Sequence, residues 1–144
     1  MDKKVITNNN LETQELGQEF ARELKSGDIV LLYGDLGSGK TTFVQGLAKG
    51  INITERILSP TFVLHRVHQV PNSDIKTFNH VDLYRIKKPT EIKNLGLGEV
   101  IGENNSIVVI EWADRLRDFN VSKGYRIYFK HLDGDKREIR IERI

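Results

Sequence analysis

The stretch GDLGSGKTT, residues 34–42, decides the fold of this chain of 144 residues. It follows the apolar run IVLLY (29–33) and leads into FVQGLAKG (43–50), so it joins an expected strand to an expected helix. The spacing G-x-x-x-x-G-K-T is that of a phosphate-binding loop, or P-loop, whose glycines let successive backbone N–H groups point at an anion. The alternative is a plain glycine-rich turn, and the strand–loop–helix context favours the P-loop.

Each part of this stretch has an expected task. The start of the helix adds the positive end of its dipole to the anion site. Lys40 is expected to reach the β- and γ-phosphates of a nucleotide, and the hydroxyl of Thr41 to ligate Mg²⁺. The residues expected to contact phosphate are Leu36, Gly37, Ser38, Gly39, Lys40, Thr41 and Thr42.

Composition limits the class of protein. Hydrophobic residues make up 38% and charged residues 29% of the chain, and the net charge of +2 gives no electrostatic case for non-specific nucleic-acid binding. The absence of cysteine excludes disulfides and thiol nucleophiles and fits a reducing cytoplasm. No stretch reaches the roughly 20 apolar residues of a membrane span, so we expect a cytoplasmic protein with no membrane partner.

The remaining pattern predicts one α/β domain over residues 1–144. The apolar runs 29–33 and 106–111 are typical of buried central strands. Expected helices lie at 11–25, 40–49, from 89 onward and at 114–119, and expected strands lie within 57–68 and at 29–33, 76–85, 106–111, 125–132 and 137–144. In the strand within 57–68, we expect Phe62, Leu64 and Val67 to face the core.

Two acids stand where expected strands end. Glu111 follows an apolar strand, and its carboxylate is placed to hold Mg²⁺, directly or through water, or to orient an attacking water. Asp82 is the second candidate for the Mg²⁺ shell or for positioning the water. The alternatives are a helix-capping role for Glu111 and a structural ion pair of Asp82 with Arg85 or with a nearby lysine. His80 is expected to pack or to hydrogen-bond in the core.

Two further segments have functional and structural interpretations. In Ser59–Phe62, Thr61 is the candidate sensor of the γ-phosphate and its Mg²⁺, and the alternative is a plain turn. Trp112 is expected to pack, to wall the phosphate site or to face a partner.

The absence of certain motifs limits which nucleotide the loop is expected to bind and which class of P-loop protein this is. No N-K-x-D or T-K-x-D guanine-reading motif occurs, which argues against a GTPase. No arginine-dense lid is present, which weakens the case for a small-molecule kinase. A slow ATPase is therefore favoured, and a small-molecule P-loop kinase and a non-catalytic, nucleotide-dependent binding module stay open as alternatives.

Four segments in order, GDLGSGKTTF, SPTF, HVDLYR and IEW, resemble the bacterial TsaE family, the small P-loop ATPase of tRNA threonylcarbamoyladenosine biosynthesis. The resemblance covers about residues 10–112 and the C-terminal hairpin. The chain departs from the family pattern at Ser38, where alanine is usual, and at Val81, where phenylalanine is common. The fold that the resemblance implies is a three-layer, P-loop NTPase-like α/β fold with a parallel centre and antiparallel flanking strands.

The resemblance also implies a function and a site. ATP would bind at the loop, with Mg²⁺ on Thr41 and Glu111 and with Asp82 needed for activity, so that Lys40, Asp82 and Glu111 form the catalytic group. The implied partners are TsaB and TsaD, which modify adenosine 37 of tRNAs reading codons that begin with adenine, so that tRNA contact is indirect.

Three outlying residues follow from the same resemblance. Thr13 is the implied adenine-side contact. Lys136 and Arg137, in the last hairpin, are implied to lie near the nucleotide. Trp112 is implied to belong to the active region.

Overall fold

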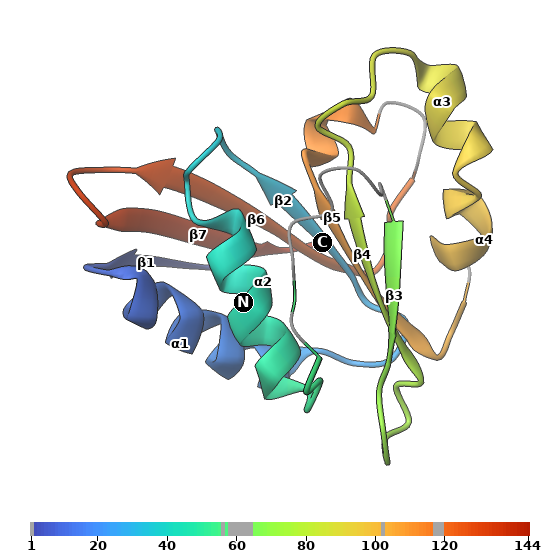
Figure 1. The fold of residues 1–144 in the computed structure, drawn as a ribbon, viewed down its shortest axis with the longest axis horizontal. Helices are drawn as coiled ribbons and strands as arrows, with labels where there is room; N and C mark the ends of the chain where they lie inside the picture. The colour runs from blue at the N-terminus through green and yellow to red at the C-terminus, as the bar shows by residue number, and fades with distance from the viewer. Residues whose placement is uncertain (1, 56, 58–64, 102, 117–119) are drawn as a thin grey trace.

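The computed structural model describes residues 2–55, 57, 65–101, 103–116 and 120–144. Within these residues a single seven-stranded sheet has the order β1-β7-β6-β2-β5-β4-β3 (Figure 1). The strands are β1 (Lys3–Thr7), β2 (Ile29–Tyr33), β3 (His65–Gln69), β4 (Thr77–Asp82), β5 (Ser106–Glu111), β6 (Gly124–His131) and β7 (Arg137–Arg143). The helices are α1 (Asn10–Phe20), α2 (Lys40–Gly50), α3 (Pro89–Asn94) and α4 (Leu97–Ile101), with short 3₁₀ turns η1 (Ala21–Glu23) and η2 (Ala113–Arg115).

Strand β2, which leads into the glycine-rich loop, lies at the centre of the sheet. It pairs in parallel with β5 on one side and with β6 on the other, and β4 is parallel to β5. The pairs β1–β7, β6–β7 and β3–β4 are antiparallel. This confirms the predicted mixed sheet with a parallel centre and antiparallel flanks.

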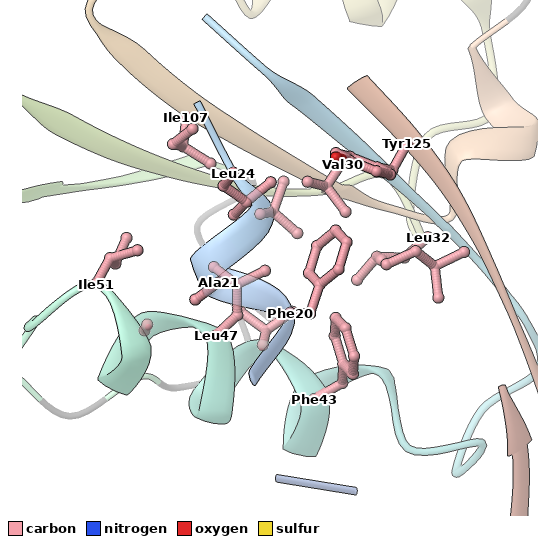
Figure 2. Close-up of a cluster of buried hydrophobic side chains, with 14 of the residues drawn as sticks. Phe20, Ala21, Leu24, Val30, Leu32, Phe43, Leu47, Ile51, Ile107 and Tyr125 are labelled. Atoms are coloured by element: carbon pink, nitrogen blue, oxygen red, sulfur yellow. The ribbon is translucent and has the colours of Figure 1, made fainter. Parts of the chain in front are cut away.

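Helices cover both faces of the sheet, which gives three layers. Helices α1 and α2 lie side by side on one face, and α3 and α4 belong to the other (Figure 1). Figure 2 shows Phe20 and Phe43 from the helices meeting Val30 and Leu32 from β2. Burial of such large apolar side chains is the main driving force for docking the P-loop helix on its strand.

The contact between α1 and α2 depends on glycine. A Cβ atom added at Gly46 would lie 1.8 Å from the carbonyl oxygen of Gln14, and one added at Gly17 would lie 2.2 Å from that of Phe43. Both distances are far below a van der Waals contact, so the two backbones approach as closely as they do because neither position has a side chain. The close contact at these two glycines therefore fixes the position of α2 against α1.

Helix α1 begins as its sequence indicates. Asn9 is the N-cap, and its side chain accepts a hydrogen bond of 2.8 Å from the backbone N–H of Glu12. The predicted helix 11–25 is divided, because α1 ends at Phe20 and a 3₁₀ turn follows. Leu11, in the first turn of α1, is 63% exposed.

Several strand and helix predictions need correction. Strand β1 was not predicted, and β4 ends at Asp82 rather than at residue 85. Val67 was expected to face the core but is 52% exposed, because β3 is an edge strand and its neighbour His68 takes the buried side. The helix expected at 114–119 is only the 3₁₀ turn η2, and residues 117–119 lie outside the described part.

The predicted core positions Phe62 and Leu64 also lie outside the described residues. In the part of the chain that the structure describes, no helix has both the length and the apolar character needed to cross a membrane.

Candidate functional site

A cavity of about 340 Å³ opens at the carboxyl ends of β2, β4 and β5. Ligands bind at this edge in open α/β sheets. The lining residues are Asn10, Leu36, Gly37, Ser38, Gly39, Lys40, Thr41, Thr42, Asp82, Tyr84, Arg85, Glu111, Trp112 and Arg137. The fold thus brings the glycine-rich loop, both predicted acids, Trp112 and Arg137 around one space.

The loop has the backbone conformation that its glycines allow. Gly34, Gly37 and Gly39 have φ angles of 148°, 74° and 100°, in the region that side chains disfavour. A Cβ atom at Gly34 would come within 2.8 Å of Ser38 Oγ, whereas one at Gly37 would meet nothing within 4 Å. Space is therefore limiting at Gly34, and only the backbone angle requires glycine at Gly37.

Lys40 is nearly buried, and its ammonium group lies within the loop. Its Nζ donates hydrogen bonds to the carbonyl oxygens of Gly34 and Asp35, the second at 2.9 Å, and lies 4.4 Å from the centre of the Trp112 ring. Burial lowers the pKa of Lys40, and the nearby carboxylates of Glu111 and Asp82 oppose this effect. The side chain is thus held at the loop, close to where a bound phosphate would need a cation.

The two acids are neighbours because β4 and β5 are parallel and in register. Asp82 is paired with Glu111, which is in turn paired with Leu32 of β2. The pKa of Asp82 is raised, chiefly because the carboxyl group is buried, and the charge of Glu111 adds to this effect. The backbone N–H of Tyr84, which donates to Oδ1 at 2.9 Å, opposes it. Two buried carboxylates at the ends of adjacent strands can together bind a cation.

The donor set fits a phosphate and Mg²⁺. Ser38 Oγ, within the loop, and Arg137 Nε, beside it, are buried and have no hydrogen-bond partner among the described residues, and an anion bound at the loop would accept from them. No group of three or more histidine, cysteine, aspartate or glutamate side chains that could hold a metal occurs in the described part of the chain. Mg²⁺ usually takes one or two carboxylates and completes its shell with phosphate and water, which Thr41, Asp82 and Glu111 would allow.

Trp112 forms a wall of the cavity. Its backbone has φ 58° and ψ 45°, a left-handed conformation that costs a non-glycine residue about 1 kcal/mol or more. The indole ring lies 5.0 Å from the ring of Tyr84 and under the ammonium of Lys40. Of the interpretations left open by the sequence, the structure supports two, because Trp112 packs against the apolar core on this face of the sheet and also lines the cavity.

Some predicted residues do not line the cavity. Thr13 has no exposed surface, and its hydroxyl is 2.7 Å from that of Thr7 between β1 and α1. The residue of this segment that does line the cavity is Asn10, about one turn earlier in the helix. Lys136 is exposed and outside the lining, while its neighbour Arg137 is inside it. An adenine contact by Thr13 stays a prediction, and in this structure its side chain offers no free surface.

Other site residues were missed or cannot be placed. Tyr84 was missed and lines the cavity, and its position two residues after Asp82 was the signal that could have indicated it. Arg85, considered from the sequence as an ion-pair partner of Asp82, lines the cavity too. Thr61, the candidate switch residue, and the rest of Ser59–Phe62 lie outside the described residues.

Together, the sheet order and the loop define the class: this is a P-loop NTPase-like α/β protein of three layers. The sequence model of the family described as "Threonylcarbamoyl adenosine biosynthesis protein TsaE" matches residues 7–139. The chain belongs to this TsaE family, as its motifs indicated.

Individual relatives agree. The chain is 39% identical over 131 residues to the tRNA threonylcarbamoyladenosine biosynthesis protein TsaE of Rickettsia typhi, covering 90% of this chain and 88% of that protein. It is 35% identical over 133 residues to the protein of the same description from Bacillus subtilis, covering 92% and 80%. A crystal structure of Bacillus subtilis YdiB superposes with a TM-score of 0.78 at 30% identity, covering 98% of this chain and 84% of that one.

Proposed function

We propose that this protein binds and hydrolyses ATP with Mg²⁺, and that hydrolysis serves the threonylcarbamoyl modification of adenosine 37 in tRNAs reading codons that begin with adenine. In this proposal it acts in the cytoplasm with TsaB and TsaD, and it meets tRNA only through that complex. The observation that carries the proposal is the single cavity that joins the glycine-rich loop to Asp82 and Glu111, in a chain of the TsaE family.

The roles of the residues follow from their positions. Backbone N–H groups of residues 36–42 and the start of α2 would bind the phosphates. Lys40 would donate to phosphate oxygens in place of the carbonyls of Gly34 and Asp35, and so stabilise the charge that develops as water attacks. Thr41, Glu111 and Asp82 would hold Mg²⁺, which when bound neutralises phosphate charge. A slow rate is expected for the isolated protein, because in this proposal the partner complex completes the site.

The test is hydrolysis by wild type and by Lys40→Ala, measured with the protein alone, with TsaB–TsaD added, and then with tRNA added. We expect stimulation of wild type by the complex and a loss of roughly 100-fold or more in Lys40→Ala, because the cation at the phosphates is removed. Lys49→Ala, which removes an exposed lysine from the last turn of the same helix, is the matched control and should behave as wild type.

Wild-type hydrolysis by folded Lys40→Ala would contradict the site. Transfer of labelled phosphate from ATP to an added nucleoside or sugar would instead identify a small-molecule kinase. Full support of tRNA modification by a variant unable to hydrolyse ATP would identify a nucleotide-dependent binding module.

A further inference from the structure

The acid at the end of β5 has a buried partner. The Oε2 atom of Glu111 lies 2.5 Å from Nε2 of His80, and neither side chain is more than 3% exposed. A carboxylate removed from water to this degree is stable only with a hydrogen-bond donor or a counter-charge. The contact with His80 therefore explains how Glu111 can be buried at the cavity before any cation is bound.

The register of the sheet creates this contact. His80 is paired with Val109, and Asp82 with Glu111, so His80 and Glu111 are diagonal neighbours on adjacent strands. Alternate residues of a strand share a face, which puts His80, Asp82 and Glu111 on the same side of the sheet. Asp82 and Glu111 line the cavity, whereas His80 is completely buried and does not. His80 thus supports the acid from within the protein.

The chemistry of the imidazole fits a fixed donor. A carboxylate oxygen only accepts hydrogen bonds, so Nε2–H is the donor in this contact and Oε2 of Glu111 is the acceptor. The other ring nitrogen, Nδ1, is buried and has no hydrogen-bond partner among the described residues, so the ring is held to the site through Nε2. With Oε2 held by the imidazole, rotation of the Glu111 carboxylate is restricted, and its other oxygen is left for a ligand in the cavity.

We propose that His80 is a positioning residue that fixes the Glu111 carboxylate in the orientation needed to take up Mg²⁺ with the nucleotide. This inference rests on the proposed function and adds the residue that orients its acid. Hydrogen-bonded groups behind metal-binding carboxylates commonly contribute tenfold to a hundredfold in metal affinity.

The experiment measures binding rather than hydrolysis. Binding of a fluorescent ATP analogue is titrated with Mg²⁺ and is measured again in EDTA, alongside thermal unfolding. His80→Gln keeps an amide donor close to the position of Nε2, whereas His80→Asn is too short to place one there, and His80→Leu removes the donor while filling the space. His68→Gln is the matched control, because His68 is also buried beside a glutamate, Glu55, but lies away from the cavity.

We expect the apparent Mg²⁺ affinity to fall roughly tenfold or more in His80→Asn and His80→Leu, and to stay within a few-fold of wild type in His80→Gln and His68→Gln. Nucleotide binding in EDTA should be unchanged in all four. The inference would be overturned if His80→Asn or His80→Leu, whichever folds, showed the Mg²⁺ dependence of wild type. It would also be overturned if nucleotide binding fell as much in EDTA as with Mg²⁺, because His80 would then have a packing role only. A wild-type protein whose nucleotide binding ignores Mg²⁺ would instead overturn the proposed function itself.

Discussion

On one side of the cavity, residues 34–42 offer backbone N–H groups; on the other, Asp82 and Glu111 offer carboxylates from the ends of two strands. The loop side depends on local backbone angles, with three glycines in the left-handed region. The acid side depends on the register between β4 and β5, which brings together residues almost thirty positions apart. Substitutions in the loop should therefore weaken the site by straining the backbone. Substitutions of the acids should act by changing the charge at the cavity.

The largest effect is expected from removing the acid of β5. Glu111→Ala should lower Mg²⁺-dependent hydrolysis by roughly 100-fold, because the carboxylate that holds the cation or orients the water is gone. Nucleotide binding in EDTA should fall far less, since the loop supplies it. Parallel measurement of hydrolysis and binding checks this difference, and wild-type hydrolysis would remove Glu111 from the mechanism.

A change in the loop should act through the backbone. Gly39 has φ 100°, and a Cβ atom there would lie 3.3 Å from Nε of Arg137. Gly39→Ala should lower the free energy of unfolding by about 1–3 kcal/mol and weaken nucleotide binding with and without Mg²⁺.

The matched control for this change is Gly98→Ala, in the exposed part of α4. It should be neutral or stabilising by up to about 1 kcal/mol, because alanine favours helix more than glycine does. Denaturant unfolding compares the two variants, and equal effects would show that the loop angle is unimportant.

The acid side should show a dependence on pH in the ligand-free protein. Because burial raises the pKa of Asp82 in the folded state, the folded protein holds this proton more tightly than the unfolded chain, whose value is near the ordinary 3.8. Protonated Asp82 therefore contributes stability in full below the pKa of the unfolded chain, and this contribution is lost as the pH rises through the pKa of Asp82 in the folded protein. Asp82→Asn should therefore be more stable than wild type at neutral pH, with the difference vanishing in acid.

Unfolding by urea at a series of pH values measures this difference. A variant that is less stable than wild type at neutral pH would show that Asp82 is stabilised by its surroundings rather than strained by them.

The smallest effect is expected at Ser38. Its buried Oγ has no partner among the described residues, so Ser38→Ala should change the free energy of unfolding by about 0.5 kcal/mol or less, or stabilise slightly. Nucleotide affinity should fall by a few-fold, because the substitution removes a hydroxyl that is placed to donate to a bound phosphate. Unchanged affinity would show that the hydroxyl only fills space.

The same division explains what the sequence could predict. The loop, β2, β5 and the last hairpin were predicted because glycine spacing and apolar runs are local signals. Glu111 was found because it ends the apolar run of β5, and Asp82 because apolar residues flank it at the end of β4. Strand β1 was missed because KKVIT is short and two of its five residues are charged, and only its pairing with β7 makes it a strand.

Contacts set by packing between distant segments were beyond local patterns. The bond between His80 and Glu111 depends on strand register, and the burial of Thr13 depends on the hydroxyl of Thr7 in the unpredicted β1. Val67 was assigned to the wrong side because alternation alone does not say which side of an edge strand is covered.

The strand order has a consequence for synthesis of the chain. Strand β2 leads into the nucleotide loop, yet its neighbours β5 and β6 are made much later, with Ile29 paired to both Val108 and Gly124. Strand β1 must wait longer still, for β7. The loop emerges early from the ribosome, but β2 has no neighbouring strand until β5 has been translated and no neighbour on its other side until β6 follows, so folding during translation is delayed by these long-range pairings. A nascent chain stalled before β5 would carry the complete motif without Glu111.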